Sequence, residues 1–235
     1  MSTKANDLTI YERRANEWWD PRSPAFRSLH SVNRFRVELL FDWLGRDWSG
    51  RTVIDVGCGG GLLAAPLSKA GARVIGLDLS HASLRAASER IGRTFVRADL
   101  MRVPLASAVA DVVLLADVLE HVENVELALR EASRLLVAGG VVYVNTINRT
   151  RRAKLLAVDL AEGVGLVPRG THDARLFVEP DALRQAAWRH GLVLDELQGE
   201  RVDLWKTVSR WAVALRRSDD LSVGYSALFR KAATL

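Results

Sequence analysis

A glycine-rich turn follows a short apolar run near residue 55. The run Val53–Val56 leads into Gly57, Gly59 and Gly61. Glycine permits a tight turn and lets the backbone approach a ligand closely. The free N–H groups at the start of the following helix then face that ligand. A buried strand, a glycine turn and a helix in this order indicate a binding loop for a nucleoside-containing cofactor.

Three aspartates accompany this turn. Asp55 lies in the apolar run before it, and Asp99 follows the third apolar run. Asp78 ends the second run, about 20 residues after Gly57, where a carboxylate meets the hydroxyls of an adenosine ribose. Asp99 is placed to meet the adenine amino group, and its alternative role is the N-cap of a helix.

The spacing of the glycines separates two classes of ligand. A dinucleotide fingerprint needs its third glycine at position 62, where this chain has Leu62. The spacing Gly57-x-Gly59-x-Gly61, together with the acidic residues, therefore favours the adenosyl sulfonium S-adenosylmethionine. Cys58 inside the turn is interpreted as a small packed residue, because methyl transfer needs no thiolate.

Alternating strand and helix patterns must position these residues. Short apolar runs alternate with helical patterns from residue 52 onward, which indicates βαβ units in a mainly parallel sheet. The expected strands are Thr52–Val56, Arg73–Leu77, Thr94–Ala98, Asp111–Ala116, Val141–Thr146, Leu192–Leu197 and Tyr225–Arg230. The expected helices of this part are Leu62–Ala70, His81–Ile91, Val125–Leu136 and Asp181–His190. The predicted fold class is α/β, a Rossmann-like doubly wound sheet of about seven strands.

Two helices are expected in front of the sheet. The capping-box pattern Thr9-Ile10-Tyr11-Glu12 starts a helix that runs to Trp19, and a second helix spans Val32–Leu44. We expect one domain over residues 1–235, with N-terminal helices in 1–50 that close over the cofactor. The irregular stretch after the fifth strand, 147–178, is interpreted as an insertion that faces the substrate and a membrane.

Several further segments resemble one protein family. Asp55–Gly61 resembles the first motif of the class I S-adenosylmethionine-dependent methyltransferases. The segments that resemble the ubiquinone-biosynthesis O-methyltransferases, which methylate polyprenyl catechols, are Trp18-Trp19-Asp20, Leu29-His30-x-x-Asn33-x-x-Arg36, Leu119-Glu120-His121-Val122, Asn145-Thr146-x-Asn148-Arg149 and Val167-Pro168-x-Gly170-Thr171-His172-Asp173. They cover most of residues 11–180, and the Arg36 and Gly170–Asp173 segments are more selective than the glycine motif.

The resemblance implies contacts to the cofactor outside the glycine turn. Arg36 matches an arginine that reaches the cofactor carboxylate, for which its planar guanidinium is suited. Gly57 and Asp78 match other contacts to the cofactor. Ala116 stands where the family often has methionine, so only a backbone contact is implied.

The resemblance also implies a reactive set after the fourth strand. Asp117, Glu120 and His121 match a carboxylate–carboxylate–histidine set that holds a divalent metal in some members, with magnesium preferred and manganese or zinc as alternatives. Asp117 replaces the more usual glutamate and has a shorter reach. A catechol hydroxyl is protonated at neutral pH, so a metal or a base must act on its proton. Glu120 and His121 are therefore the candidate catalytic residues, against the alternative of a helix-start glutamate and a hydrogen-bonded core histidine.

Two features suggest how a lipid-like substrate would reach this site. His172 and Asp173 lie either in a loop that covers the substrate or in a turn held by local hydrogen bonds. The basic cluster Arg149–Lys154 runs into the apolar stretch Leu155–Val158, and basic residues beside an apolar helix suit an anionic bilayer surface. The alternative is an ordinary amphipathic helix packed on the domain.

Composition limits the partners and the compartment. The net charge of +5 and the pI of 9.8 fit an anionic partner or a solvated arginine-rich surface. The charge is scattered without an aromatic platform, so nucleic acid is not expected. A single cysteine excludes an intramolecular disulfide, and no apolar run approaches the ~18 residues of a membrane span. We expect a cytoplasmic protein in peripheral contact with the inner face of the cell membrane.

The expected function is O-methylation of a polyprenylated catechol or hydroquinol in ubiquinone-type biosynthesis. Its expected partners are the polyprenyl phenolic substrate, an anionic membrane and other enzymes of the quinone pathway. One alternative is a small-molecule O-, N- or C-methyltransferase of specialised metabolism. An alternative of another class is a non-catalytic lipid-binding or scaffold subunit.

Overall fold

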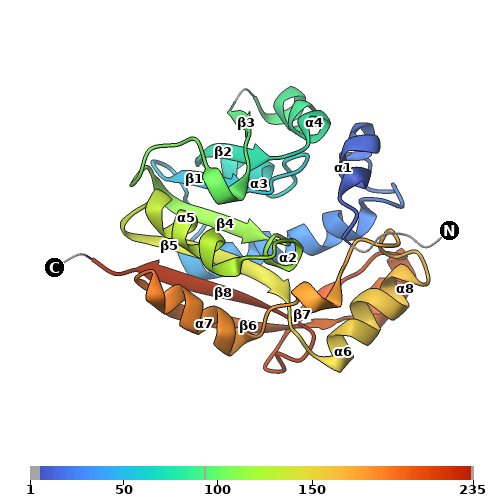
Figure 1. The fold of residues 1–235 in the computed structure, drawn as a ribbon. Helices are drawn as coiled ribbons and strands as arrows, with labels where there is room; N and C mark the ends of the chain where they lie inside the picture. The colour runs from blue at the N-terminus through green and yellow to red at the C-terminus, as the bar shows by residue number, and fades with distance from the viewer. Residues whose placement is uncertain (1–5, 93, 234–235) are drawn as a thin grey trace.

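One eight-stranded sheet forms the centre of the computed structural model, which describes residues 6–92 and 94–233 (Figure 1). The ends of the predicted domain, residues 1–5 and 234–235, lie outside the described residues. The strand order is β3-β2-β1-β4-β5-β8-β6-β7. The parallel strands are β1 (Thr52–Val56), β2 (Arg73–Asp78), β3 (Phe95–Arg97), β4 (Ala110–Ala116) and β5 (Leu136–Ile147). The antiparallel strands are β6 (Leu192–Val202), β7 (Leu215–Ser218) and β8 (Gly224–Lys231).

The predicted doubly wound α/β fold is confirmed, but the expected number of strands is wrong. The chain order reverses between β1 and β4, which creates a crevice at the carboxyl ends of these strands. The additional strand is β7, which pairs with β6 at the edge of the sheet. It is short and carries Arg216 and Arg217, so its sequence lacks the apolar alternation of a half-buried strand.

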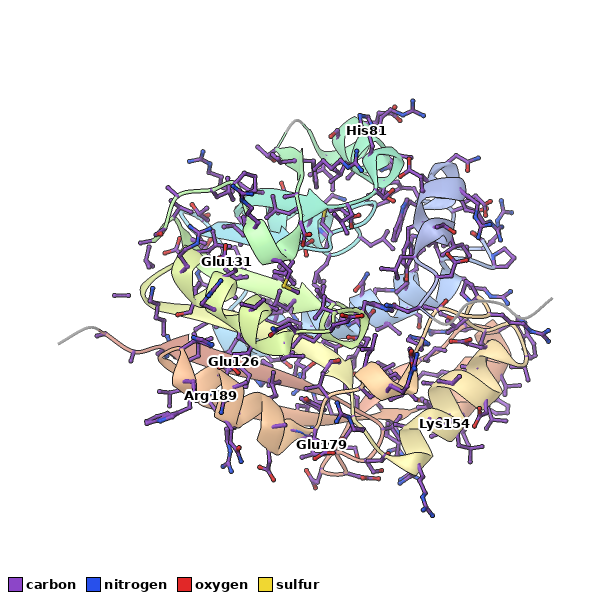
Figure 2. All side chains as sticks on the ribbon, in the orientation of Figure 1. His81, Glu126, Glu131, Lys154, Glu179 and Arg189 are labelled. Carbon is purple, nitrogen blue, oxygen red and sulfur yellow. The ribbon has the colours of Figure 1, made fainter. Side chains whose placement is uncertain are left out.

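Helices cover both faces of the sheet. On one face, α2 (Arg27–Leu44) and α3 (Ala64–Lys69) bury Leu40 and Leu67 against the strands. On the other face, α5 (Val125–Leu135) and α7 (Pro180–Arg189) pack their apolar sides on the sheet. Arg189 of α7 also pairs with Glu126 of α5 at 3.1 Å (Figure 2).

The N-terminal segment is less regular than predicted. It forms α1 (Thr9–Arg13) and the 3₁₀ turn η1 (Ala15–Glu17) instead of one continuous helix. The predicted capping box is wrong, because the N-cap is Leu8, which forms no side-chain cap hydrogen bond, and the Thr9 N–H donates to Asp7 Oδ1 at 3.0 Å. Glu12 instead accepts hydrogen bonds from Ser80 Oγ and the Ala82 N–H at the start of α4 (His81–Ile91). A carboxylate is favourable at a helix N-terminus, so Glu12 fastens α1 beside the crevice.

The insertion after β5 and the β6–β7 connection both approach α2. The insertion contains α6 (Arg151–Ala153), the π-helical segment η4 (Lys154–Glu162) and the 3₁₀ turn η5 (Ala174–Leu176). The connection contains α8 (Leu204–Arg210). Ser28 of α2 donates to the Leu166 carbonyl at 2.6 Å and accepts from the Val213 N–H at 3.1 Å, which ties both segments to one residue.

None of the helices within 6–92 and 94–233 is both long and apolar enough to cross a membrane.

Candidate active site

A cavity occupies the crevice at the carboxyl ends of β1 and β4. The predicted cofactor residues that line it are Arg36, Gly57, Gly59, Asp78, Asp99 and Ala116. Gly61 is placed elsewhere: its φ is 82°, and a Cβ there would lie 2.5 Å from Ile91 Cδ1 of α4. Glycine at position 61 therefore lets the turn pack on α4 and does not face this cavity.

Two of the predicted aspartates hold backbone groups at the cavity wall. Asp78 accepts hydrogen bonds from the N–H groups of Gly59 and Ser80, both at 2.8 Å. Burial raises the pKa of Asp78 despite these bonds. Asp99 accepts from the Met101 N–H at 2.9 Å and so caps the 3₁₀ turn η2 (Leu100–Arg102), the alternative role named above, while it also lines the cavity.

Two buried polar atoms beside this cavity have no hydrogen-bond partner among the residues that the structure describes. They are Arg36 Nε, a donor, and Asp55 Oδ2, an acceptor. Burial and the nearby charge of Asp78 raise the pKa of Asp55 to about 7. An unpaired buried donor and an unpaired buried acceptor are costly. They complement the carboxylate and the ammonium group at the amino-acid end of S-adenosylmethionine, so the residues present fit the predicted cofactor.

The N-terminal segment forms one wall of the same cavity through Tyr11, Trp18 and Leu29. The Trp18 ring lies so close to the glycine turn that a Cβ on Gly60 would sit 2.3 Å from Trp18 Cγ. Trp18 also donates from Nε1 to Ser83 Oγ at 2.8 Å. The described residues before α2 therefore lie against the glycine turn and form part of the cavity wall.

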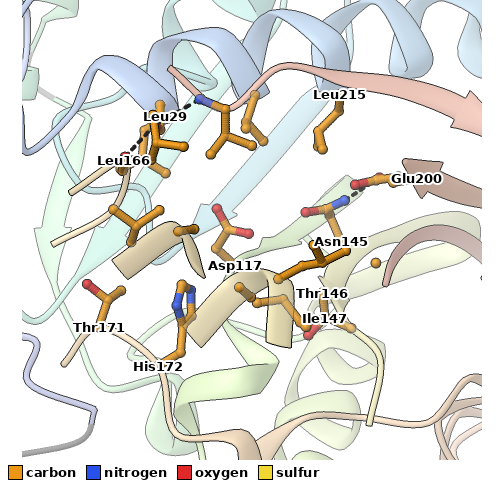
Figure 3. Close-up of a pocket in the computed structure, with 18 of the residues that line it drawn as sticks. Leu29, Asp117, Asn145, Thr146, Ile147, Leu166, Thr171, His172, Glu200 and Leu215 are labelled. Carbon is orange, nitrogen blue, oxygen red and sulfur yellow. Dashed lines mark hydrogen bonds between the residues drawn. The ribbon is translucent and has the colours of Figure 1, made fainter. Parts of the chain in front are cut away.

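A second, mostly apolar cavity adjoins the first (Figure 3). Its apolar wall comes from α2, the insertion and the β6–β7 connection. The residues of this wall include Leu29, Val32, Ile147, Leu156, Leu166, Val167, Val213 and Leu215. Both cavities are lined by Tyr11, Leu29, Arg36, Asp117 and His121. A ligand in the apolar cavity would thus meet a ligand in the crevice at these five residues.

The polar end of the apolar cavity is a buried network around Arg36. The Arg36 guanidinium donates to Asp117 Oδ1 and to Asn145 Oδ1. Asn145 in turn donates to Glu200, the bond drawn in Figure 3. Burial would raise the pKa of Asp117, but the Arg36 charge and hydrogen bond outweigh it and hold the pKa below its usual range. Asp117 is therefore an ionised carboxylate paired with Arg36.

Glu120 and His121 are both uncharged in this environment. The Glu120 side chain is fully buried, accepts from Thr146 Oγ1 at 2.8 Å, and leaves Oε1 without a partner. Burial and the Asp117 charge raise the pKa of Glu120 to about 8. Burial lowers the pKa of His121 to about 4, and its Nδ1 lies 2.7 Å from Asn6 Oδ1. A neutral His121 that donates from Nδ1 presents Nε2 as an acceptor.

The predicted metal set of Asp117, Glu120 and His121 is not assembled. Within the described part of the chain, no group of three or more His, Cys, Asp and Glu side chains could hold a metal ion. Asp117 is committed to Arg36, and Glu120 is protonated at neutral pH. As placed in this structure, these side chains do not form a divalent-metal site, and a site at these residues stays a prediction.

A second histidine, held by a glutamate of the insertion, faces the apolar cavity. Glu162 Oε1 accepts from the His172 N–H at 2.9 Å and lies 3.0 Å from His172 Nδ1. A carboxylate at Nδ1 fixes the tautomer with its acceptor at Nε2. Figure 3 shows the His172 ring directed toward Asp117, and its centroid lies 6.0 Å from that of His121. Asp173, by contrast, caps η5 through the Arg175 N–H, which is the local-turn alternative.

Sequence reasoning named no role for Glu162, Asn145 or Glu200. Asn145 carried a usable signal, because it and Thr146 are polar residues at the end of an apolar strand. Glu162 and Glu200 lie in stretches without a periodic pattern that would separate them from surface glutamates. Their burial, 6% and 4% exposed, is what distinguishes them.

Comparison with known proteins agrees with this geometry. The family model described as a methyltransferase domain matches residues 54–144. A ubiquinone biosynthesis O-methyltransferase of Methylobacterium sp. (strain 4-46) is 37% identical, with 91% of each chain covered. Another from Ralstonia nicotianae is 35% identical over 91% of this chain and 94% of that protein. The solved magnesium protoporphyrin IX methyltransferase of Synechocystis PCC 6803, with bound SAH, has the same fold: its TM-score is 0.64 at 19% identity, over 97% of this chain and 96% of that one.

Proposed function

The chain belongs to the ubiquinone biosynthesis O-methyltransferases, a family of S-adenosylmethionine-dependent enzymes, and from that premise we propose that it methylates a hydroxyl of a polyprenylated catechol or hydroquinol. One observation carries the proposal. The crevice that fits the cofactor and the apolar cavity share Tyr11, Leu29, Arg36, Asp117 and His121 as their common wall. A phenolic ring at this wall would have its polyprenyl tail in apolar surroundings and its hydroxyl beside the cofactor.

The residues of the crevice hold the cofactor, which when bound supplies a sulfonium methyl group that is already activated. Arg36 Nε and Asp55 Oδ2 bind the amino-acid end, and Asp78 binds the ribose. Positioning accounts for much of such a reaction, because the oxygen must lie in line with the methyl carbon, and the remaining task is to remove the hydroxyl proton. The buried Arg36–Asp117 pair fixes the guanidinium at the junction of the two cavities.

The imidazole of His172 accepts the hydroxyl proton. Nε2 would take the proton as the methyl group leaves the sulfonium sulfur, which becomes a neutral thioether, and bonds to the oxygen. Glu162 would stabilise the resulting imidazolium through Nδ1. His121 faces the same cavity, and burial lowers its pKa to about 4, so it holds a proton only in acid. His121 therefore serves to orient the ring, and the earlier assignment of proton transfer to Glu120 and His121 moves to His172.

We derive no step through a divalent metal. A metal at Asp117, Glu120 and His121 would require Asp117 to leave Arg36 and Glu120 to ionise in a buried position. The side chains described here instead supply a charged pair, a neutral Glu120 and a neutral His121.

Peripheral contact with an anionic membrane is part of the proposal. The insertion exposes Leu155, Leu160 and Val164, and Arg151 is exposed and forms no ion pair with any other residue that the structure describes. Lys154, labelled in Figure 2, is paired with Asp159, and Arg152 is paired with Asp220. Charge reversal at Arg151 is expected to weaken binding to anionic liposomes, and unchanged co-sedimentation would contradict a role of this segment.

The test is methyl transfer from labelled S-adenosylmethionine to a short-tail prenyl catechol, with and without EDTA and added magnesium. We expect product that EDTA does not reduce. Product that requires magnesium would contradict the assignment of His172 as the base. No product, with cofactor still bound, would contradict the substrate class and favour another small-molecule methyltransferase. Equal turnover of a catechol without a prenyl tail would also contradict the substrate class.

A further inference from the structure

Helix α8 exposes an apolar face that no other described part of the chain covers. Trp205 is 82% exposed, Leu204 71% and Val208 66%, and Trp211 at the end of the helix is also exposed. Residues 204, 208 and 211 follow the spacing of one helix face, with Trp205 beside them. Large apolar side chains that gather at one place on a surface mark an interaction site.

Basic residues precede, lie on and follow the helix that carries this face. Arg201 precedes the helix, Lys206 and Arg210 lie on it, and Arg216 follows it. Lys206 pairs with Asp203 at 3.3 Å, whereas the exposed side chains of Arg201 and Arg210 form no hydrogen bond or ion pair within the described part of the chain. Tryptophan flanked by arginine and lysine suits the boundary between lipid headgroups and acyl chains.

The same connection forms part of the apolar cavity. Val202 just before α8, and Val213 and Leu215 just after it, line that cavity. The insertion is tied to the end of this connection, because Ser28 bonds both Val213 and Leu166. Helix α8 therefore carries an apolar outer face on a chain segment whose two ends line the proposed tail site.

We propose that α8 inserts its apolar face into an anionic bilayer and thereby brings the apolar cavity to the membrane in which a polyprenyl substrate is dissolved. The purpose of the contact rests on the proposed function, but the contact itself does not. A second copy of the chain is a poorer occupant, because a twofold-symmetric contact through α8 would bring the unpaired Arg201 and Arg210 of both copies together. A bilayer with acidic headgroups instead neutralises them.

The test uses the full chain and vesicles of equal parts phosphatidylcholine and phosphatidylglycerol. The variant Leu204→Ser/Trp205→Ser removes the most exposed part of the face. Its matched control is Trp188→Ser, because Trp188 on α7 is 68% exposed but lies away from the connection. We expect the α8 variant to lose about tenfold or more of its affinity for these vesicles. The control should bind like the unaltered protein.

Two further measurements separate the possible causes. Both variants should methylate a water-soluble short-tail catechol at rates within about twofold of the unaltered protein, since neither site lines the cavities. Vesicle affinity that is unchanged in the α8 variant would overturn the proposal. A dimer in sedimentation that only the α8 variant dissociates, without a change in vesicle affinity, would assign the face to a second copy. If the unaltered protein fails to methylate the catechol while the α8 variant still loses vesicle binding, the proposed function fails and the bilayer contact stands.

Discussion

Two buried carboxyl groups at the reaction centre have opposite protonation states. Asp117 is ionised because Arg36 donates to it, whereas Glu120 has only the Thr146 hydroxyl and a pKa raised to about 8. Environments that push two pKa values apart give two acids of the same type different roles. Asp117 holds the guanidinium in place, and Glu120 is a neutral group behind it.

The raised pKa of Glu120 predicts that folding stability depends on pH. The pKa of Glu120 is higher in the folded state than in the unfolded state. Its protonated carboxyl therefore stabilises the folded state fully at a pH below the unfolded pKa, and this contribution is lost as the pH rises through about 8. Between pH 5 and 8 this group alone should lower the free energy of unfolding by about 1.4 kcal/mol per pH unit. Glu120→Gln should remove that slope in urea denaturation, while Glu123→Gln at an exposed position should keep it. Equal slopes for both variants would contradict the assignment.

Substitution of Asp78 is expected to weaken cofactor binding. Asp78→Ala removes the acceptor proposed for the ribose hydroxyls. It also removes the hydrogen bonds that the Gly59 and Ser80 N–H groups donate to Asp78. Hydrogen bonds to a charged group contribute about 1.5–3 kcal/mol, so affinity for S-adenosylmethionine should fall at least about tenfold in calorimetry. The affinity of Asp78→Asn, which retains one acceptor oxygen, should lie between those of the unaltered protein and Asp78→Ala. Near-normal affinity of Asp78→Ala would refute the assignment.

At the scale of elements, the insertion converts a cofactor-binding sheet into a site with two cavities. The segment η4 directs Leu156, Ala157 and Ala161 into the apolar cavity. The residue that ends it, Glu162, holds both the backbone and the ring of His172. One element thus supplies the wall for the tail and the orientation of the base.

Loss of the Glu162 carboxylate should therefore slow catalysis without affecting cofactor binding. For Glu162→Gln we expect kcat to fall about tenfold, and for His172→Gln about 100-fold or more, since positioned acid–base catalysis is worth at least that much. Affinity for S-adenosylmethionine should stay unchanged in both. Glu179→Gln, an exposed position labelled in Figure 2, is the control. An unaltered kcat in His172→Gln would exclude it as the base.

The molecule as a whole places the cofactor crevice between two parts of the chain that are distant in sequence. The sheet contributes Gly57, Asp78 and Ala116, and the segment before and within α2 contributes Trp18 and Arg36. A ligand bound there connects both parts and binds only the folded state.

Cofactor product should consequently stabilise the whole chain. S-adenosylhomocysteine at 100 times its Kd should add about 2.7 kcal/mol, which corresponds to a rise in Tm of about 5–10 °C for a chain of this length. Differential scanning calorimetry measures this rise. Asp78→Ala should show little of it at the same concentration, and an equal rise in both proteins would place the ligand outside the crevice.

The sequence by itself determined the fold class, the strand that carries the glycine turn, and the family. These features depend on local regularities, such as apolar periodicity along β1 and β4 and the spacing of Gly57, Asp78 and Asp99. Local patterns report which face of an element is buried, so they also located most helices and strands to within a few residues. They missed β7, whose edge position leaves it charged.

Only the tertiary structure decided the chemistry of the site. Arg36 and Asp117 are 81 residues apart in the chain, and their pairing joins the Asp117 carboxylate to the guanidinium. Burial, which a sequence pattern does not measure for a single polar residue, makes Glu120 neutral and distinguishes Glu162 and Glu200 from surface glutamates. Solvent exposure likewise decides the role of α8, because a sequence pattern alone would assign its apolar residues to the buried core. The physical reason is that protonation and pairing depend on long-range contacts and solvent access, which arise only when the chain is folded.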